Sequence, residues 1–168
     1  MTMIYTLIGM PGSGKSCMSR AVSGKLNMKA LDADKVIERR MGKKLNEIIE
    51  EFGIDEFRKI EEETLLSINQ NNIILATGGS AVYYERAMQH LKKSGKIIYL
   101  YVSFETMLKR LGDYSKRGIV MRPGQTIKEL YEERAALYKK YADVTINCDG
   151  TAYSYYRAQV IKAIQESL

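Results

Sequence analysis

Short apolar runs alternate along this chain with longer segments in which apolar and polar positions mix at helical spacing. Five of the runs are rich in β-branched, aromatic or other apolar residues and are bounded by glycine or polar residues, which predicts buried strands. They cover residues 3–8, 30–32, 72–76, 96–102 and 144–147. Apolar strands separated by helices predict a mostly parallel sheet with helices on both faces, and therefore an α/β fold.

The segments between the strands carry the helical pattern. Ser103 and Thr126 each precede such a segment and can cap it, and Glu129 completes a capping box with Thr126. The expected helices cover residues 14–26, 34–42, 45–69 with a break near Gly53, 83–94, 103–111, 126–140 and 154–166. Because no linker-like segment divides the 168 residues, the pattern predicts a single domain over residues 1–168.

The loop after the first expected strand has the sequence Gly-Met-Pro-Gly-Ser-Gly-Lys-Ser over residues 9–16. It matches the phosphate-binding pattern G-x-x-x-x-G-K-[ST] at every fixed position. Glycines let successive backbone N–H groups point at one anion, and the helix that follows presents its positive end to the same phosphates. Lys15 can contact the β- and γ-phosphates, and Ser16 can offer its hydroxyl to Mg²⁺. A chance glycine turn is the alternative, but the motif lies between a strand and a helix, as nucleotide binding requires. The sequence thus predicts a nucleotide-binding loop, in which Gly12, Ser13, Gly14, Lys15, Ser16 and the next residue, Cys17, would contact the nucleotide.

Residues suited to chemistry also follow the next two strands. Asp32 and Asp34 lie at the end of the second strand, and Gly78 and Gly79 follow the third. In an open parallel sheet, ligands gather at this edge. One aspartate can hold Mg²⁺ through water, and the other can accept the proton of an attacking hydroxyl. The alternatives are that Asp34 only caps the next helix and that the two glycines form an ordinary turn.

The charge of the chain indicates an anionic partner. The sequence has 26 Lys+Arg against 20 Asp+Glu, which gives a net charge of +6. Residues 109–140 hold nine of the basic and four of the acidic residues, so +5 of the surplus lies there. Nucleic acid, anionic lipid and phosphorylated small molecules are all compatible with a basic chain. The concentration of charge in one region favours small anions.

Several classes of protein are excluded. Cys17 and Cys148 cannot form a disulfide framework, and no Cys/His spacing resembles a zinc site. The longest apolar run, residues 97–102, is too short to cross a bilayer, and the glycine motif begins too early to leave room for a secretory signal. We therefore expect a cytoplasmic protein that has no membrane partner.

An ordered set of signatures resembles the shikimate kinase family. The set comprises Gly9 to Ser16, Leu31-Asp32-Ala33-Asp34, Phe57-Arg58 with Glu61, Thr77-Gly78-Gly79, Arg122-Pro123, Glu133-Arg134, Leu137-Tyr138 and Ala142-Asp143. The combination of Asp-x-Asp, Phe-Arg-x-x-Glu and Gly-Gly is much more specific than the phosphate loop alone. The family transfers the γ-phosphate of ATP to the 3-hydroxyl of shikimate in aromatic amino-acid biosynthesis.

The resemblance implies a P-loop kinase fold of the nucleoside-monophosphate-kinase type, with a five-stranded parallel sheet in the order 2-3-1-4-5. It implies a substrate-binding subdomain over residues 33–61 and a lid over residues 112–124. ATP, Mg²⁺ and shikimate would be the ligands, and we expect a monomer that binds no nucleic acid. By position, catalysis would rest on Lys15, Asp34 and Arg122, Mg²⁺ on Ser16 and Asp32, the nucleotide on Arg110 and Arg117, and shikimate on Asp34, Arg58, Gly78, Gly79, Ser80 and Arg134.

The chain departs from the family pattern near the substrate. Ser80 stands where the family usually has a third glycine. Gly124 and Gln125 follow the lid's Arg-Pro, where the family usually has two leucines. The lid also contains an extra stretch at residues 116–119, so either Arg117 or Arg122 can be the lid arginine.

Alternatives remain for the arginines and for the function. Arg58 can pair with Glu61 or Glu62 on a helix surface, and Arg134 has similar acidic neighbours. A kinase of another hydroxylated acid, such as gluconate, is the neighbouring function. A non-catalytic protein that binds nucleotide or nucleic acid is the alternative of a different class.

Overall fold

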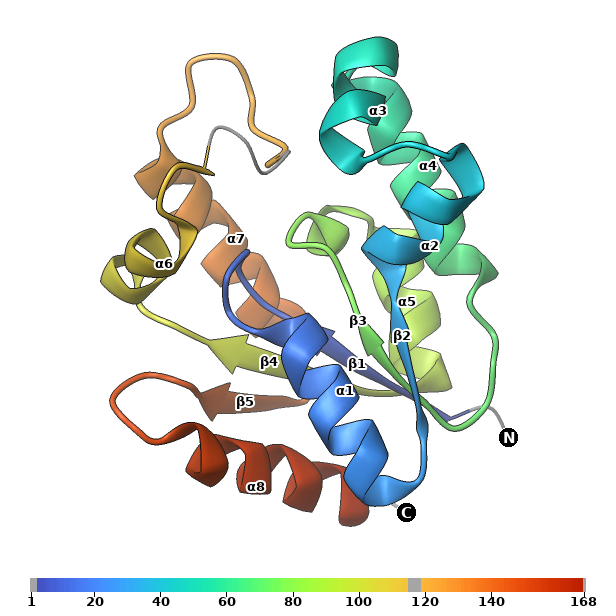
Figure 1. The fold of residues 1–168 in the computed structure, drawn as a ribbon, viewed down its shortest axis with the longest axis vertical. Coiled ribbons are helices and arrows are strands. Elements are labelled where there is room, and N and C mark those ends of the chain that lie inside the picture. Colours follow the sequence, from blue (N-terminus) through green and yellow to red (C-terminus); the bar gives the residue numbers. More distant parts are fainter. Residues whose placement is uncertain (1–2, 115–118, 168) are drawn as a thin grey trace.

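The computed structural model, which describes residues 3–114 and 119–167, contains a five-stranded parallel sheet with helices packed on both faces (Figure 1). The strands lie in the order β2-β3-β1-β4-β5, which confirms the predicted α/β class and strand order. The strand bounds are β1 Ile4–Ile8, β2 Lys29–Asp32, β3 Ile73–Ala76, β4 Gly95–Tyr101 and β5 Val144–Asn147.

Helices α1 and α8 cover one face of the sheet, and α5 and α7 lie on the other, with α4 packed against α5 (Figure 1). None of the helices in the described residues has the length and apolar character that a membrane span requires. The helix bounds are α1 Lys15–Leu26, α2 Ala33–Met41, α3 Leu45–Phe52, α4 Ile54–Ser67, η1 Ala81–Tyr83, α5 Glu85–Ser94, α6 Phe104–Leu111, α7 Ile127–Tyr141 and α8 Tyr153–Gln165.

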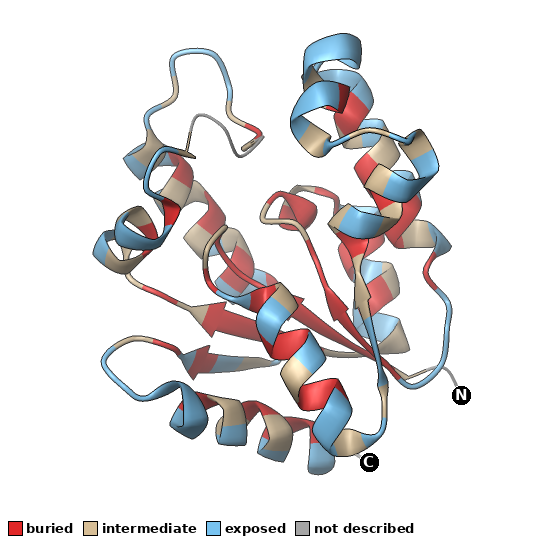
Figure 2. Cartoon of the chain, viewed as in Figure 1, coloured by how far each residue is buried: buried red, intermediate tan, exposed pale blue. Residues whose placement is uncertain are grey.

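The central strands explain where the core lies. Every residue of β1 and β3 is buried, as expected for strands covered on both faces, whereas the edge strands β2 and β5 keep exposed positions (Figure 2). In the pairing register, Ala76 lies opposite both Leu7 and Asp32. The loops that follow β1, β2 and β3 therefore leave the sheet side by side at its carboxyl edge.

Helices α2, α3 and the start of α4 extend beyond this edge and have a small apolar core of their own (Figure 1). Ile37, Ile48 and Phe57 are each at most 1% exposed and form this core. Val120, from the loop between α6 and α7, packs into the same cluster. The expected subdomain of residues 33–61 covers these helices, and its role in substrate binding remains a prediction.

Local signals set most helix boundaries. The break expected near Gly53 is confirmed, because this residue separates α3 from α4 with a φ of 85°. Ser103 and Thr126 cap α6 and α7 as predicted, and their hydroxyls accept from N–H groups three residues on, at 3.2 and 3.1 Å. One α-helix begins at Glu85 and not at residue 83, because residues 81–83 form a 3₁₀ turn.

Candidate active site

The loop between β1 and α1 curls its main chain around the start of the helix. Gly12 and Gly14 have φ values of 80° and 92°, in the left-handed region that favours glycine. The Ser13 N–H donates to the Met10 carbonyl at 3.0 Å, and α1 begins at Lys15. The Ser13 side chain is buried, and its hydroxyl has no partner in the described residues. The strand–loop–helix context that the phosphate-binding motif requires is therefore present.

Lys15 is 8% exposed and folds back over the loop that precedes it. Its Nζ donates to the Gly9 carbonyl at 2.7 Å and to the Met10 carbonyl at 2.9 Å. Burial lowers the pKa of this ammonium to about 8, although the carboxylates of Asp34 and Asp32 act in the opposite direction. A phosphate group beside Nζ would favour the charged form and would compete with the two carbonyls for its hydrogen bonds.

A cavity of about 420 Å³ opens beside Lys15 at the carboxyl edge of the sheet. The phosphate loop, the start of α2 and the loop after β3 form most of its wall, and residues from α3, α4, α7 and the loop before α7 complete it. These segments are far apart in the chain and meet because their strands are neighbours. The predicted site residues that line the cavity are Gly12, Gly14, Lys15, Ser16, Cys17, Asp34, Gly78, Gly79, Ser80 and Arg134.

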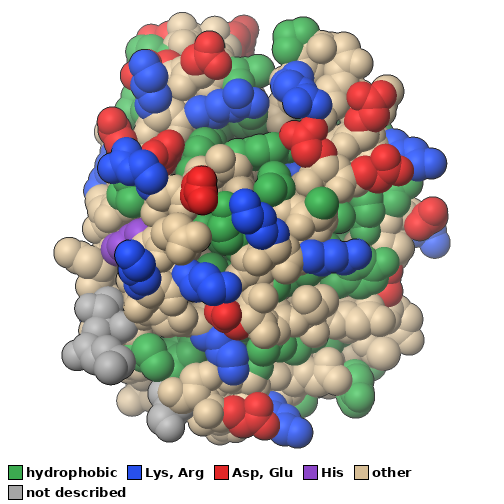
Figure 3. Space-filling view, turned by 180° about the vertical axis from the view of Figure 1, so that it is seen from behind, with side chains coloured by type: hydrophobic (Ala, Val, Ile, Leu, Met, Phe, Trp, Pro, Cys, Tyr) green, Lys and Arg blue, Asp and Glu red, His purple; other side chains and the backbone are tan. Residues whose placement is uncertain are grey.

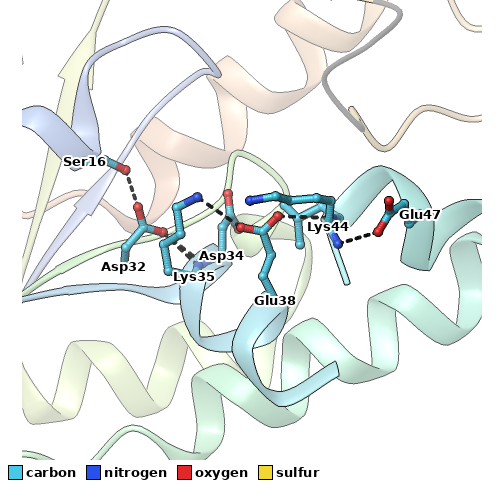
Figure 4. A network of polar contacts seen from close by, with 8 residues as sticks. Ser16, Asp32, Asp34, Lys35, Glu38, Lys44 and Glu47 are labelled. Carbon is cyan, nitrogen blue, oxygen red and sulfur yellow. Dashed lines mark hydrogen bonds and ion pairs between the residues drawn. The ribbon is translucent and has the colours of Figure 1, made fainter. Parts of the chain in front are cut away.

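Ser16, in the first turn of α1, and Asp32, at the start of α2, face each other (Figure 4). The Ser16 hydroxyl donates to Asp32 Oδ2 at 2.5 Å. Asp32 Oδ1 accepts from the backbone N–H groups of Asp34 and Lys35, at 3.0 and 3.3 Å. Asp32 is therefore the residue that caps α2, and the interpretation of Asp34 as a cap is wrong.

The Ser16–Asp32 pair fits Mg²⁺. The described residues contain no group of three or more Asp, Glu, His or Cys side chains arranged to hold a metal. Mg²⁺ suits such a sparse site because it keeps several waters and binds through one or two protein oxygens together with substrate phosphates. Ser16 Oγ and Asp32 Oδ2 already lie close enough to share one cation.

Asp34 lies in the first turn of α2 and lines the cavity. Its Oδ1 is buried and has no hydrogen-bond partner in the described residues. Burial, together with the charges of Glu61 and Asp32, raises the pKa of this carboxyl to about 7, although Lys15 acts in the opposite direction. A carboxyl group with this pKa can hold or release a proton near neutral pH, as a general base must.

The two glycines after β3 are required because other site groups approach their main chain. A Cβ on Gly78 would lie 2.8 Å from both Asp34 Oδ1 and Glu61 Oε2. A Cβ on Gly79 would lie 2.7 Å from Arg134 Nη1. A side chain at either position would displace these site groups, so the glycines do more than form an ordinary turn.

Arg134 is 1% exposed, so the interpretation of this residue as part of a surface ion pair is wrong. It shares one face of α7 with Leu130 and Tyr138, which are also buried. Nη2 donates to the Val120 carbonyl at 2.7 Å, and the guanidinium lies 5.5 Å from the centre of the Tyr83 ring. Nε is buried without a partner in the described residues. A buried planar guanidinium with an available donor suits a carboxylate ligand.

Arg58 lies beside the cavity and does not line it. The ion pairs considered for this residue do not form in the described part of the chain: Glu61 accepts from the Ser80 hydroxyl, and Glu62 pairs with Arg86 at 3.5 Å. Burial raises the pKa of Glu61, while its hydrogen bond with Ser80 and the charges of nearby arginines, Arg58 among them, lower it. A contact between Arg58 and substrate remains a prediction.

The other predicted arginines lie around the rim of the site. Arg110 Nη1 donates to the Gly12 carbonyl at 3.2 Å, which places it beside the phosphate loop. Arg122 is exposed, pairs with Glu133 at 2.8 Å and does not line the cavity. Arg117 lies outside the described residues. Both Arg117 and Arg122 remain candidates for the lid arginine.

The structure adds residues that the sequence analysis did not assign to the site. Glu61 and Phe57 line the cavity, together with Leu45, Val120 and Arg20. Glu61 and Phe57 are four residues apart in α4, so the Phe-Arg-x-x-Glu signature places them on one face of a helix and could have identified both. Val120 belongs to a loop and carries no periodic signal that would have revealed its position.

A phosphate loop on a parallel sheet, a Ser–Asp pair suited to Mg²⁺ beside it and the half-buried Asp34 carboxylate in the adjoining cavity define a P-loop phosphotransferase. Comparisons with known proteins identify the family. The model of the shikimate kinase family matches residues 11–167. The chain belongs to the shikimate kinase family.

Relatives and solved structures agree with this assignment. The shikimate kinase of Sulfurihydrogenibium sp. (strain YO3AOP1) is 36% identical over 160 residues, which cover 95% of this chain and 96% of the relative. That of Thermodesulfovibrio yellowstonii is 36% identical over 159 residues, covering 93% and 91%. The structure of shikimate kinase from Acinetobacter baumannii in complex with shikimate has a TM-score of 0.86 at 29% identity, covering 98% of this chain and 94% of that one. Shikimate kinase from Aquifex aeolicus has a TM-score of 0.81 at 32% identity, covering 98% and 95%.

Proposed function

We propose that this protein transfers the γ-phosphate of ATP to the 3-hydroxyl of shikimate in the presence of Mg²⁺. The observation that carries the proposal is the convergence of Lys15, Asp34 and Arg134 on one cavity. They supply a cation for phosphates, a carboxylate for a hydroxyl and a guanidinium for a carboxylate. Shikimate has one carboxylate and three hydroxyls, and the similar structure from Acinetobacter baumannii is a complex with shikimate.

Lys15 and the loop of residues 9–16 would hold the β- and γ-phosphates. The left-handed conformations of Gly12 and Gly14 suit a loop whose backbone N–H groups converge on one anion, and the Lys15 ammonium can leave its two carbonyl partners for a phosphate oxygen. Bound Mg²⁺, held by Ser16 and Asp32, would neutralise phosphate charge. Phosphoryl transfer depends mainly on alignment and on neutralisation of charge, and these groups supply both.

Asp34 would orient the 3-hydroxyl and accept its proton. The hydroxyl oxygen forms a bond to the γ-phosphorus, and the bond from that phosphorus to the β–γ bridging oxygen breaks, so that ADP leaves. The proton passes to the Asp34 carboxylate. Only the ionised carboxyl can accept it, so activity should rise with pH as Asp34, whose pKa burial raises to about 7, loses its proton.

Arg134 would bind the carboxylate of shikimate. Its Nε is buried without a partner among the residues that the structure describes, and Gly79 lies beside its Nη1. Arg58 stands close by and can contribute a second guanidinium. Because Nη2 already donates to the Val120 carbonyl, the same side chain connects the substrate site with the loop before α7, where Arg117 or Arg122 would close over the phosphates.

A coupled assay with ATP, Mg²⁺ and shikimate tests the proposal. We expect turnover by the wild type and a loss in kcat of about a hundredfold or more for Lys15→Ala and for Asp34→Asn. Lys25→Ala is the matched control, because Lys25 is an exposed lysine of the same helix and lies outside the cavity. It should retain wild-type turnover.

Other acceptors in the same assay separate the neighbouring functions. If gluconate is phosphorylated and shikimate is not, shikimate is rejected as the acceptor, but the assignment as an ATP-dependent kinase stands. Binding of ATP without transfer to any acceptor would instead favour a nucleotide-binding protein that is not an enzyme.

The basic surplus over residues 109–140 gives little support to a nucleic-acid partner. Among its described members Arg134 alone lines the cavity, and Arg122 is paired with Glu133. On the face shown in Figure 3, lysine and arginine side chains alternate with aspartates and glutamates and do not form one basic band. We propose that no nucleic acid binds, and salt-dependent binding of RNA or DNA in a titration would contradict this.

We also propose a monomer in a reducing cytoplasm. Cys17 and Cys148 are both free thiols, which suits a reducing compartment. The phosphate loop, Asp34 and Arg134 converge within one chain, so the proposed reaction calls on no residue of a second subunit. Light scattering should give a mass near 19.1 kDa, and twice that mass would contradict the monomer.

A further inference from the structure

Ser80, where this chain departs from the usual glycine of the family, makes a defined contact inside the cavity. The residue is 5% exposed, and its hydroxyl donates to Glu61 Oε1. Glu61 is 2% exposed and lines the same cavity. A glycine at position 80 could not make this hydrogen bond, so the orientation of Glu61 in this chain depends on the serine.

The other oxygen of Glu61 faces Asp34 across Gly78. Glu61 Oε2 and Asp34 Oδ1 both lie 2.8 Å from the position that a Cβ of Gly78 would occupy. Because Gly78 has no side chain, it leaves both oxygens uncovered. Asp34 Oδ1 has no hydrogen-bond partner in the described residues. Two carboxylate oxygens therefore meet in one small region of the cavity. Such a pair suits two neighbouring hydroxyls, each of which donates one hydrogen bond.

Besides Ser80, two other side chains lie near the Glu61 carboxylate and would determine its orientation if the Ser80 hydroxyl were absent. Arg58 lies three residues earlier on α4, and the buried hydroxyl of Tyr84 is also near the Glu61 carboxylate. In the described residues Arg58 forms no ion pair with Glu61, while Ser80 holds Oε1. Loss of the Ser80 hydroxyl would leave Glu61 free to turn toward Arg58 and away from Asp34.

We propose that Ser80 is a positioning residue for substrate specificity, because its hydroxyl holds Glu61 where Glu61 and Asp34 together bind two adjacent hydroxyls of the acceptor. The inference rests on the proposed function, in which Asp34 binds the 3-hydroxyl of shikimate. Glu61 then binds the neighbouring 4-hydroxyl. The site thereby selects acids that carry a second hydroxyl next to the one that is phosphorylated.

Steady-state kinetics of Ser80→Ala and Ser80→Gly test the role of the hydroxyl. The KM for shikimate should increase about tenfold, which is the effect of losing one hydrogen bond to a buried carboxylate. The KM for ATP and kcat should change less than about twofold, because the phosphate loop and Asp34 are unaltered. Ser80→Thr keeps a hydroxyl and should restore most of the affinity for shikimate.

Ser23→Ala is the matched control. Ser23 is 6% exposed, its hydroxyl donates to the Arg20 carbonyl at 3.0 Å, and it lies outside the cavity. This substitution removes a buried, hydrogen-bonded serine hydroxyl without touching Glu61, and all three kinetic parameters should stay at their wild-type values.

The analogue 4-deoxyshikimate, which keeps the carboxylate and the 3-hydroxyl, separates positioning from a general disturbance of the site. Ser80→Ala should lose about tenfold in KM with shikimate but less than about twofold with the analogue, because the bond that Glu61 makes is already absent. Equal losses with both compounds, or no loss with shikimate, would overturn the role of Ser80 and leave the proposed function intact. Failure of the wild type to phosphorylate shikimate would overturn both.

Discussion

Asp34→Asn should make the folded protein more stable at neutral pH while it abolishes turnover. Burial, with Glu61 and Asp32 nearby, raises the pKa of this carboxyl from 3.8 to about 7. The ionised group is therefore costly to the folded chain, and a site built for proton transfer lowers stability. Asparagine has almost the same shape and no charge, so it removes the cost and also removes the base.

The sign and the size of the effect follow from the two pKa values. At a pH between them, the folded chain binds a proton that the unfolded chain has released, so the free energy of unfolding of the wild type falls as pH rises. Above about pH 7 the carboxyl is ionised in both states and the loss is complete. A pKa raised by about three is equivalent to about 4 kcal/mol. The asparagine variant has no such dependence at this position.

Urea unfolding of both proteins between about pH 4 and pH 7, without nucleotide and with EDTA, measures this difference. Asp34→Asn should exceed the wild type by about 4 kcal/mol at pH 7, and the excess should vanish toward pH 4. Asp55→Asn, on the exposed start of α4, should shift stability by less than about 1 kcal/mol at either pH. An excess that is the same at both ends of the pH range, or a variant less stable than the wild type at pH 7, would refute the reasoning.

Three further predictions concern packing and access. Gly79→Ala places a Cβ 2.7 Å from Arg134 Nη1, so it should raise the KM for shikimate about tenfold or more. Gly24→Ala is the contrasting glycine variant, because Gly24 is an exposed helical residue with no described atom within 4 Å of an added Cβ. It should increase the free energy of unfolding in urea by up to about 1 kcal/mol. Tyr138→Phe removes the hydroxyl that donates to the Gly79 carbonyl at 2.6 Å, so it should cost about 1–3 kcal/mol in the same measurement, and an unchanged stability would contradict it. Cys17 is exposed at the cavity and the other cysteine is buried, so a thiol reagent should label one site per native chain, and MgATP should slow that labelling; labelling at an unchanged rate would place the nucleotide elsewhere.

The strands could be predicted from the sequence because strands buried on both faces give uninterrupted apolar runs. Ile4–Ile8 and Ile73–Ala76 are wholly buried, and both were expected to within one residue. The order of the strands came from the family resemblance alone. Nothing in the residues of β3 or β4 shows that both pair with β1, because parallel pairing joins segments far apart in the chain.

The two arginines Arg122 and Arg134 show that neighbouring residues in the sequence do not predict whether an arginine is buried. Arg122 and Arg134 both have acidic neighbours in the sequence. Arg122 is exposed and forms an ion pair with Glu133, whereas Arg134 is buried. The helix face explains why Arg134 is buried. Arg134 lies one turn of α7 from Leu130 and one turn from Tyr138, and both of these residues are buried. That spacing was available from the sequence and favours burial. The contact of Ser80 with Glu61 was not available, since it joins a loop and a helix through tertiary structure alone.

Lys15 and Asp34 act on each other, so their contributions to catalysis cannot be assigned separately. Burial moves both groups toward their neutral forms, and the charge of each favours the charged form of the other. Removal of the Lys15 ammonium would therefore raise the pKa of Asp34 further and leave a smaller fraction of ionised base at neutral pH. The fall in kcat expected for Lys15→Ala thus contains two losses, that of a phosphate contact and that of an ionised carboxylate. The losses of the two single variants, when added, would overestimate what the pair contributes together.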